Sequence, residues 1–198
     1  MRHNVVRDLE ARLLKDVCRD VQTEPPLIPL SGQQFSKSAN HQDGARLDVS
    51  ARDFWTPMER AFLDIRIFHP NAPTNKSKSL KRLYETHEAE KKAVYEERVI
   101  HVEHGTFTPL VFSTSGGYGP ACTSFHKRLA LLLSDKRNDT YADAMSYVRR
   151  SLRFCILKAT LIAIRGFRGY KEKNVGMLAL SEVDFSVTQF NNKVKDSH

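Results

Sequence analysis

Cysteine, long apolar runs and acidic residues are all scarce in this sequence of 198 residues. The three cysteines, Cys18, Cys122 and Cys155, are odd in number and scattered, which is typical of reduced thiols and not of a disulfide framework. We therefore expect a nuclear or cytoplasmic location. The longest apolar-rich stretch, 154–164, is interrupted by Lys158 and is too short to span a bilayer, so we expect no membrane partner.

The shortage of acidic residues leaves the chain basic. Lysine and arginine together number 31 and the acidic residues 23, which gives a formal net charge of +8. This excess favours a polyanionic partner, and nucleic acid is the default expectation. The length suits one domain, or one domain with a tail, that can bury a core.

The most informative stretch is 46–70, which reads RLDVSARDFWTPMERAFLDIRIFHP. Apolar and polar residues alternate in two runs, 47–51 and 63–67, and this period predicts the two strands of an antiparallel hairpin. Asp48 and Asp64 lie equally far from the centre of the turn. We therefore expect the two carboxylates to face each other on one side of the sheet.

Two facing carboxylates repel unless a proton or a cation lies between them, and a divalent metal is the expected occupant at neutral pH. Magnesium takes oxygen ligands, usually one or two carboxylates, with water and phosphate oxygens completing the shell. Asp48 and Asp64 therefore predict a Mg²⁺ or Mn²⁺ site that cleaves phosphodiesters. The alternative is a slipped register, which would leave two unrelated surface acids.

Helical periodicity predicts helices over 4–18, over 79–104, around 125–132 and from the capping box at Thr140 to about residue 165. Shorter runs predict strands at 20–24 and 109–115, and the second of these is apolar enough to be the central strand, covered on both faces. On the helix 79–104, Lys91 lies on the inward-facing stripe and Lys92 lies off it. Lys91 either extends to solvent or serves a polar site, and the nearby acids favour the polar site.

Two further groups of side chains have alternative interpretations. Arg149, Arg150 and Arg153 form a possible surface for backbone phosphates, with salt-dependent binding, or an ordinary solvated helix face. Four residues could ligate zinc, but their spacing matches no zinc finger and a buried strand runs between the two pairs, so structural zinc is the less favoured reading: His101, His104, Cys122 and His126.

Taken in order, several segments resemble the restriction-like endonuclease domain, of PD-(D/E)XK type, that follows the reverse transcriptase in a class of non-LTR retrotransposon polyproteins. The resemblance covers residues 3 to about 168 and rests on RHNVVRDLEARLL, VQTEPPLIPLSG, ARLDVSA, FLDIRIFHP, HEAEKKAVYEERV and VEHGTFTPLVFSTSGG. It implies an α/β fold with a restriction-endonuclease-like core, in which helices flank a small mixed sheet and further helices follow. A domain over 1–168 and a basic, weakly structured tail over 169–198 are then expected.

In such elements the site pattern is an acid, a second acid at the start of a strand, and a lysine followed by a tyrosine on the next helix. The matching positions here are Asp48, Asp64, Lys91 and Tyr95. The resemblance implies metal-dependent DNA nicking, in which the two acids hold Mg²⁺ or Mn²⁺ and Lys91 positions or activates the attacking water. Arg66 and Tyr95 would support the phosphate and the site geometry.

Two positions depart from this pattern: Leu47 replaces the proline of the motif, and Arg66 stands where the minimal signature has lysine. A second interpretation is therefore a catalytically inactive module that binds nucleic acid through its basic surface, and a third is a structural fragment of a polyprotein. The resemblance also implies that the chain begins inside a longer polyprotein. DNA, element RNA and a reverse transcriptase domain are its implied partners.

Overall fold

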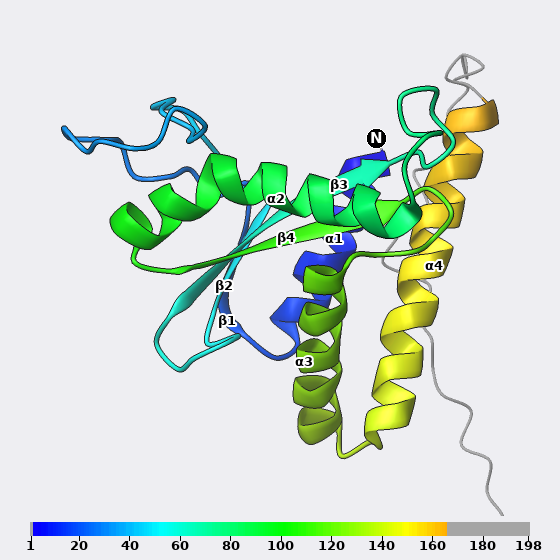
Figure 1. The fold of residues 1–198 in the computed structure, drawn as a ribbon. Coiled ribbons are helices and arrows are strands. Elements are labelled where there is room, and N and C mark those ends of the chain that lie inside the picture. The colour runs from blue at the N-terminus through cyan, green and yellow to red at the C-terminus, as the bar shows by residue number, and fades with distance from the viewer. Residues whose placement is uncertain (1, 166–198) are drawn as a thin grey trace, which may run out of the picture. The chain divides into compact units, whose positions relative to one another are not determined.

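The computed structural model describes residues 2–165, which form a mixed α/β fold with one four-stranded sheet (Figure 1). The predicted tail, 169–198, lies outside the described residues. The elements follow in the order α1 (Arg2–Lys15), β1 (Arg19–Thr23), β2 (Val49–Arg52), β3 (Arg60–Phe68), α2 (Leu80–Arg98), the π-helical turn η1 (Val99–Glu103), β4 (Thr106–Ser113), α3 (Pro120–Arg137) and α4 (Tyr141–Arg165).

The sheet is mixed, with the strand order β1-β2-β3-β4. β1 pairs with β2 and β2 with β3 in antiparallel fashion, and Val49 lies opposite Leu63. The predicted antiparallel hairpin is therefore present. β3 and β4 are parallel, with Ala61 opposite Thr106, and α2 with η1 makes the crossover between them.

The prediction that 109–115 forms the central strand is wrong, because β4 lies at an edge of the sheet. The strand is nevertheless buried. Leu110 and Phe112 pack against α3 and its neighbours, whereas Val111 packs under α2. Because helices cover both faces of this edge strand, its side chains are apolar on both faces, as they would be in a central strand. The sequence of the strand therefore does not distinguish the two positions.

The two faces of the sheet are covered by different helices. The face that we call the core face carries Val49, Leu63 and Leu110, and packs with α1, α3 and α4 into the largest apolar cluster. The opposite face, which we call the α2 face, lies under α2 (Figure 1). It carries two smaller clusters that do not merge.

The helix boundaries have local causes. Ser79 Oγ accepts the backbone N–H of Arg82 and so caps α2. At the start of α4, Thr140 and Asp143 form the predicted capping box, in which the Asp143 N–H donates to Thr140 Oγ1 at 3.2 Å. Within residues 2–165, no helix combines the length and the apolar character needed to cross a membrane.

Candidate functional site

A polar gap separates the two clusters of the α2 face. Along β3, the side chains on this face are Phe62, Asp64, Arg66 and Phe68, because alternate strand residues share a face. Phe62 belongs to one apolar cluster and Phe68 to the other. Asp64 and Arg66 therefore lie where the apolar packing is interrupted, directly beneath α2.

Asp64 is buried in this gap and is held by Lys91 of α2. The Asp64 residue is only 5% exposed, and Lys91 Nζ lies 2.6 Å from its Oδ2. Burial raises the pKa of Asp64 above its ordinary value, although the positive charge of Lys91 opposes this shift.

The angular position of each lysine on α2 decides which one reaches the acid. Lys91 is partly buried and also lies over the ring of Tyr95, 5.6 Å from its centroid. Lys92, about 100° further round the helix, is more exposed and pairs with Glu96 at 3.6 Å. The structure therefore brings together Asp64, Lys91 and Tyr95, in agreement with the helix-face prediction.

Asp48 does not lie in a strand as predicted, because β2 begins one residue later. Its own N–H donates to Leu63 O at 3.1 Å, and its carboxylate Oδ2 accepts the N–H of Ile65 at 2.6 Å. The Asp48 carboxylate thus accepts a β3 N–H that a backbone carbonyl would accept if the β2–β3 hydrogen-bond ladder continued. Leu47 packs with Phe62 on the α2 face, so the alternation predicted for 47–51 is broken at this bend.

His3 of α1 completes the surroundings of Asp48. Its Nε2 lies 3.0 Å from Asp48 Oδ2 and 3.1 Å from Ile65 O. The hydrogen bond with Asp48 raises the pKa of His3, and this effect exceeds the opposing effect of burial. Sequence reasoning missed His3, which lies just before the predicted helix 4–18 and was given no role of its own.

The two carboxylates are close to each other but are held by different neighbours, and Asp48 does not stand opposite Asp64 in a regular ladder as predicted, because its carboxylate accepts the Ile65 N–H. Asp48 takes its side-chain partner, His3, from α1, and Asp64 takes its partner, Lys91, from α2. They still interact electrostatically, because the negative charge of Asp48 contributes to the raised pKa of Asp64. The bend before β2 is the physical reason for the difference.

Arg66 is held by an acid that sequence reasoning also missed. Its Nη1 lies 2.6 Å from Glu90 Oε2, and His87 Nδ1 lies 3.4 Å from the same oxygen. Burial alone would raise the pKa of Glu90, but the hydrogen bond with His87 and the charge of Arg66 lower it. The neighbouring positions of Glu90 and Lys91 on α2 place the Arg66 anchor beside the Lys91–Asp64 pair.

The donor set allows a magnesium-type site but not a cage made by protein ligands alone. Among residues 2–165, no three His, Cys, Asp or Glu side chains are grouped so as to hold a metal ion. Two carboxylates remain, Asp48 and Asp64, and the Asp64 carboxylate is buried and pairs with Lys91 at 2.6 Å. This set fits a cation that keeps several waters and shares its shell with a phosphate.

The four candidate zinc ligands are not brought together. His101 and His104 are exposed near η1, whereas Cys122 and His126 lie in the core cluster. His126 Nε2 contacts Glu10 Oε1 at 2.8 Å, and its Nδ1 lies 3.6 Å from Cys122 Sγ. These core residues form an internal polar cluster of α1 and α3.

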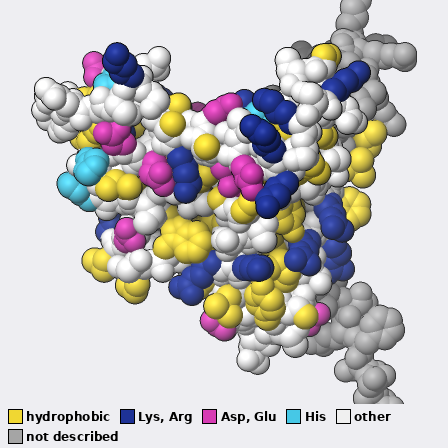
Figure 2. All heavy atoms as spheres, in the orientation of Figure 1, with side chains coloured by type: hydrophobic (Ala, Val, Ile, Leu, Met, Phe, Trp, Pro, Cys, Tyr) yellow, Lys and Arg dark blue, Asp and Glu magenta, His cyan; other side chains and the backbone are white. Residues whose placement is uncertain are grey.

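The predicted phosphate-binding arginines lie on the surface. Arg149, Arg150 and Arg153 of α4 are all exposed. Figure 2 shows Lys and Arg side chains gathered over the region where α3 and α4 lie side by side. An exposed position meets the first requirement for contact with a nucleic-acid backbone.

A scan against protein-family models found no matching family, and a search of the curated proteins found no match to this chain. The functional argument therefore rests on the residues and their contacts.

Proposed function

We propose that this chain is a metal-dependent endonuclease domain that nicks DNA, built on a restriction-endonuclease-like core. The observation that carries the proposal is the contact between buried Asp64 and Lys91 at 2.6 Å. Burying a carboxylate costs free energy, and a strand on which Phe62 and Phe68 flank the acid could have used an apolar residue there. Ionisable groups with pKa values shifted by burial and a specific partner concentrate at functional sites.

Each neighbouring residue has a role in this proposal. Asp64 and Asp48 would hold a divalent cation, which when bound would polarise the scissile phosphate and make a nucleophile from water at neutral pH. Lys91 places a fixed positive charge where negative charge develops on the phosphate. Arg66, anchored by Glu90, offers a second cation for phosphate oxygens, and Tyr95 supports the Lys91 side chain.

The second candidate function is a catalytically inactive module that binds DNA or element RNA beside a reverse transcriptase domain. Leu47 and Arg66 favour it, because they replace the proline and lysine of the nuclease signature. The contacts of Asp48 also favour the inactive module. Its Oδ2 already accepts the Ile65 N–H and contacts His3, so this oxygen is less available to a metal ion.

A plasmid-nicking assay separates the two functions. Supercoiled DNA should convert to the open-circular form with Mg²⁺ or Mn²⁺ and stay intact with EDTA. Asp64→Asn should remove this activity, and Asp135→Asn, an exposed acid on α3, should keep it. DNA binding without nicking in either metal would reject the nuclease and leave the binding module.

A further inference from the structure

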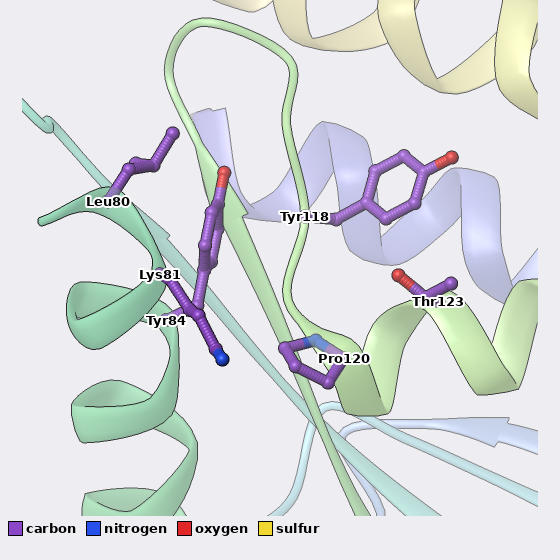
Figure 3. A pocket seen from close by; sticks show the side chains of 6 residues that line it. All are labelled: Leu80, Lys81, Tyr84, Tyr118, Pro120 and Thr123. Carbon is purple, nitrogen blue, oxygen red and sulfur yellow. The ribbon is translucent and has the colours of Figure 1, made fainter.

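A small cavity lies at the N-terminal end of α2, between its first turns and the start of α3 (Figure 3). Its volume is about 350 Å³, near the lower end of the 300–1,000 Å³ typical of ligand pockets. It therefore suits one small group. The lining residues are Leu80, Lys81, Tyr84, Tyr118, Pro120 and Thr123.

The turn between β4 and α3 carries Tyr118 and passes close to Tyr84 of α2. Figure 3 shows this turn with Tyr84 on one side and Tyr118 on the other. The close approach requires glycine, because a Cβ at Gly117 would lie 2.5 Å from Tyr84 Oη. Tyr84 is buried. Tyr118 is partly buried, because it packs against the core-face cluster with its ring centroid 5.4 Å from that of His126, so only the side of its ring turned away from this cluster can be reached by a ligand.

One lysine lines the cavity, and an arginine lies near the turn that borders it. Lys81 is exposed at the α2 wall, and its only acidic contact among the described residues is Glu85 at 3.8 Å. Arg153 of α4 approaches the turn, with its Cγ 4.0 Å from the Cβ position of Gly116. The nearby acid Glu88 accepts the N–H of Ala121, so its charge is partly satisfied by the start of α3.

The cavity and the Lys91–Asp64 pair lie along one face of α2. Lys81, Tyr84, Glu88, Lys91 and Tyr95 are spaced by three and four residues, which places them within one narrow sector of the helix. A rise of 1.5 Å per residue separates Tyr84 from Lys91 by roughly 10 Å. At about 3.4 Å per nucleotide along a stacked strand, this distance corresponds to about three nucleotides.

We propose that this cavity binds an unpaired base of single-stranded DNA, about three nucleotides from the phosphate held at Asp64 and Lys91. The placement relative to that phosphate rests on the proposed nuclease function, but the base-binding step does not. The Tyr118 ring is available only to a base that has left the duplex stack, and Lys81 and Arg153 attract the flanking phosphates. The substrate class is therefore DNA with a single-stranded or flapped segment.

The test measures binding of the full chain to fluorescent oligonucleotides by anisotropy, in EDTA so that no cleavage occurs. A single strand, a blunt duplex of the same sequence and a duplex with a single-stranded flap are compared. We expect the single strand and the flap to bind more tightly than the duplex. Tyr118→Leu should weaken single-strand binding about tenfold, within the range for loss of one base–aromatic stack, and leave duplex binding unchanged.

Two control variants isolate the aromatic ring. Tyr118→Phe keeps the ring and should keep the affinity, while Tyr141→Leu removes an exposed tyrosine at the opposite end of the α3–α4 pair and should have no effect. Unchanged single-strand binding in Tyr118→Leu, or equal affinity of the wild type for single strand and duplex, would overturn the proposal. Nicking of plasmid by the same protein tests the nuclease separately, so either proposal can fail alone.

Discussion

The two faces of the sheet treat buried ionisable groups differently. On the core face, Glu10 and His126 pair at 2.8 Å inside the largest apolar cluster, and both are at most 1% exposed. On the α2 face, Asp64 is also buried, but its partner Lys91 is 23% exposed and lies between two clusters that do not merge. A pair that solvent cannot reach can act only on stability, whereas a pair at a gap in the packing can meet a substrate.

The largest expected effect is on the core face. His126→Leu would leave the Glu10 carboxylate buried without its partner, and breaking a buried pair in this way costs about 3–5 kcal/mol. Denaturant unfolding should record this loss of free energy. Glu10→Leu combined with His126→Leu should recover most of it, because no unpaired carboxylate remains. A loss below about 1 kcal/mol in the single variant would show that the pair does not hold the core together.

On the α2 face we expect an effect on activity instead. Lys91→Ala should reduce the nicking rate about a hundredfold or more, because it removes a charge beside the developing transition state, and DNA affinity should stay nearly the same. Lys92→Ala is the matched control, since this lysine pairs with Glu96 at the surface, and it should change neither quantity. Equal loss in the two variants would contradict the assignment of Lys91.

A smaller effect concerns Asp64 and the pH dependence of stability. Burial raises the pKa of Asp64 in the folded state, so between its ordinary pKa and the raised one the folded state binds more protons than the unfolded state. The contribution of Asp64 therefore makes stability fall as pH rises through this window. Asp64→Asn should remove that fall, as measured by thermal unfolding from pH 3.5 upward. An unchanged pH profile would indicate that Asp64 titrates normally.

The smallest effect is expected at His3, which is partly exposed. The pKa of His3 is raised by its hydrogen bond with Asp48, so its stabilising contribution is complete below about pH 6.5 and is lost as pH rises through the folded-state pKa. His3→Gln should flatten this part of the stability profile. NMR titration of the His3 ring checks the direction of the shift directly, and a value at or below 6.5 would contradict it.

Local patterns predicted most of the elements. The period-two runs located β2 and β3, and helical spacing located α1, α2 and α4, because these patterns depend on neighbours in the chain. The prediction that Lys91, and not Lys92, reaches Asp64 could be made for the same reason, since it needed only the angle between adjacent helix positions.

Contacts between residues that are distant in the sequence could not be predicted from local patterns. The bend at Asp48 depends on His3, 45 residues earlier, and on the Ile65 N–H, 17 residues later. The edge position of β4 follows from strand pairing, which its apolar sequence does not encode. Glu10 and His126 are 116 residues apart, so nothing local indicated that His126 would be used in the core and be absent from a zinc site.

The carboxylate of Asp48 occupies the place of a backbone acceptor, and this has a consequence for genetics and protein engineering. An alanine at position 48 would release the Ile65 N–H and also remove any metal ligand, so lost activity in that variant would mix two causes. Asparagine keeps a carbonyl oxygen for the N–H while removing the charge. Comparing the alanine and asparagine substitutions at position 48 therefore separates loss of the backbone hydrogen bond from loss of the carboxylate charge. The asparagine variant is the one that tests the chemical role of Asp48.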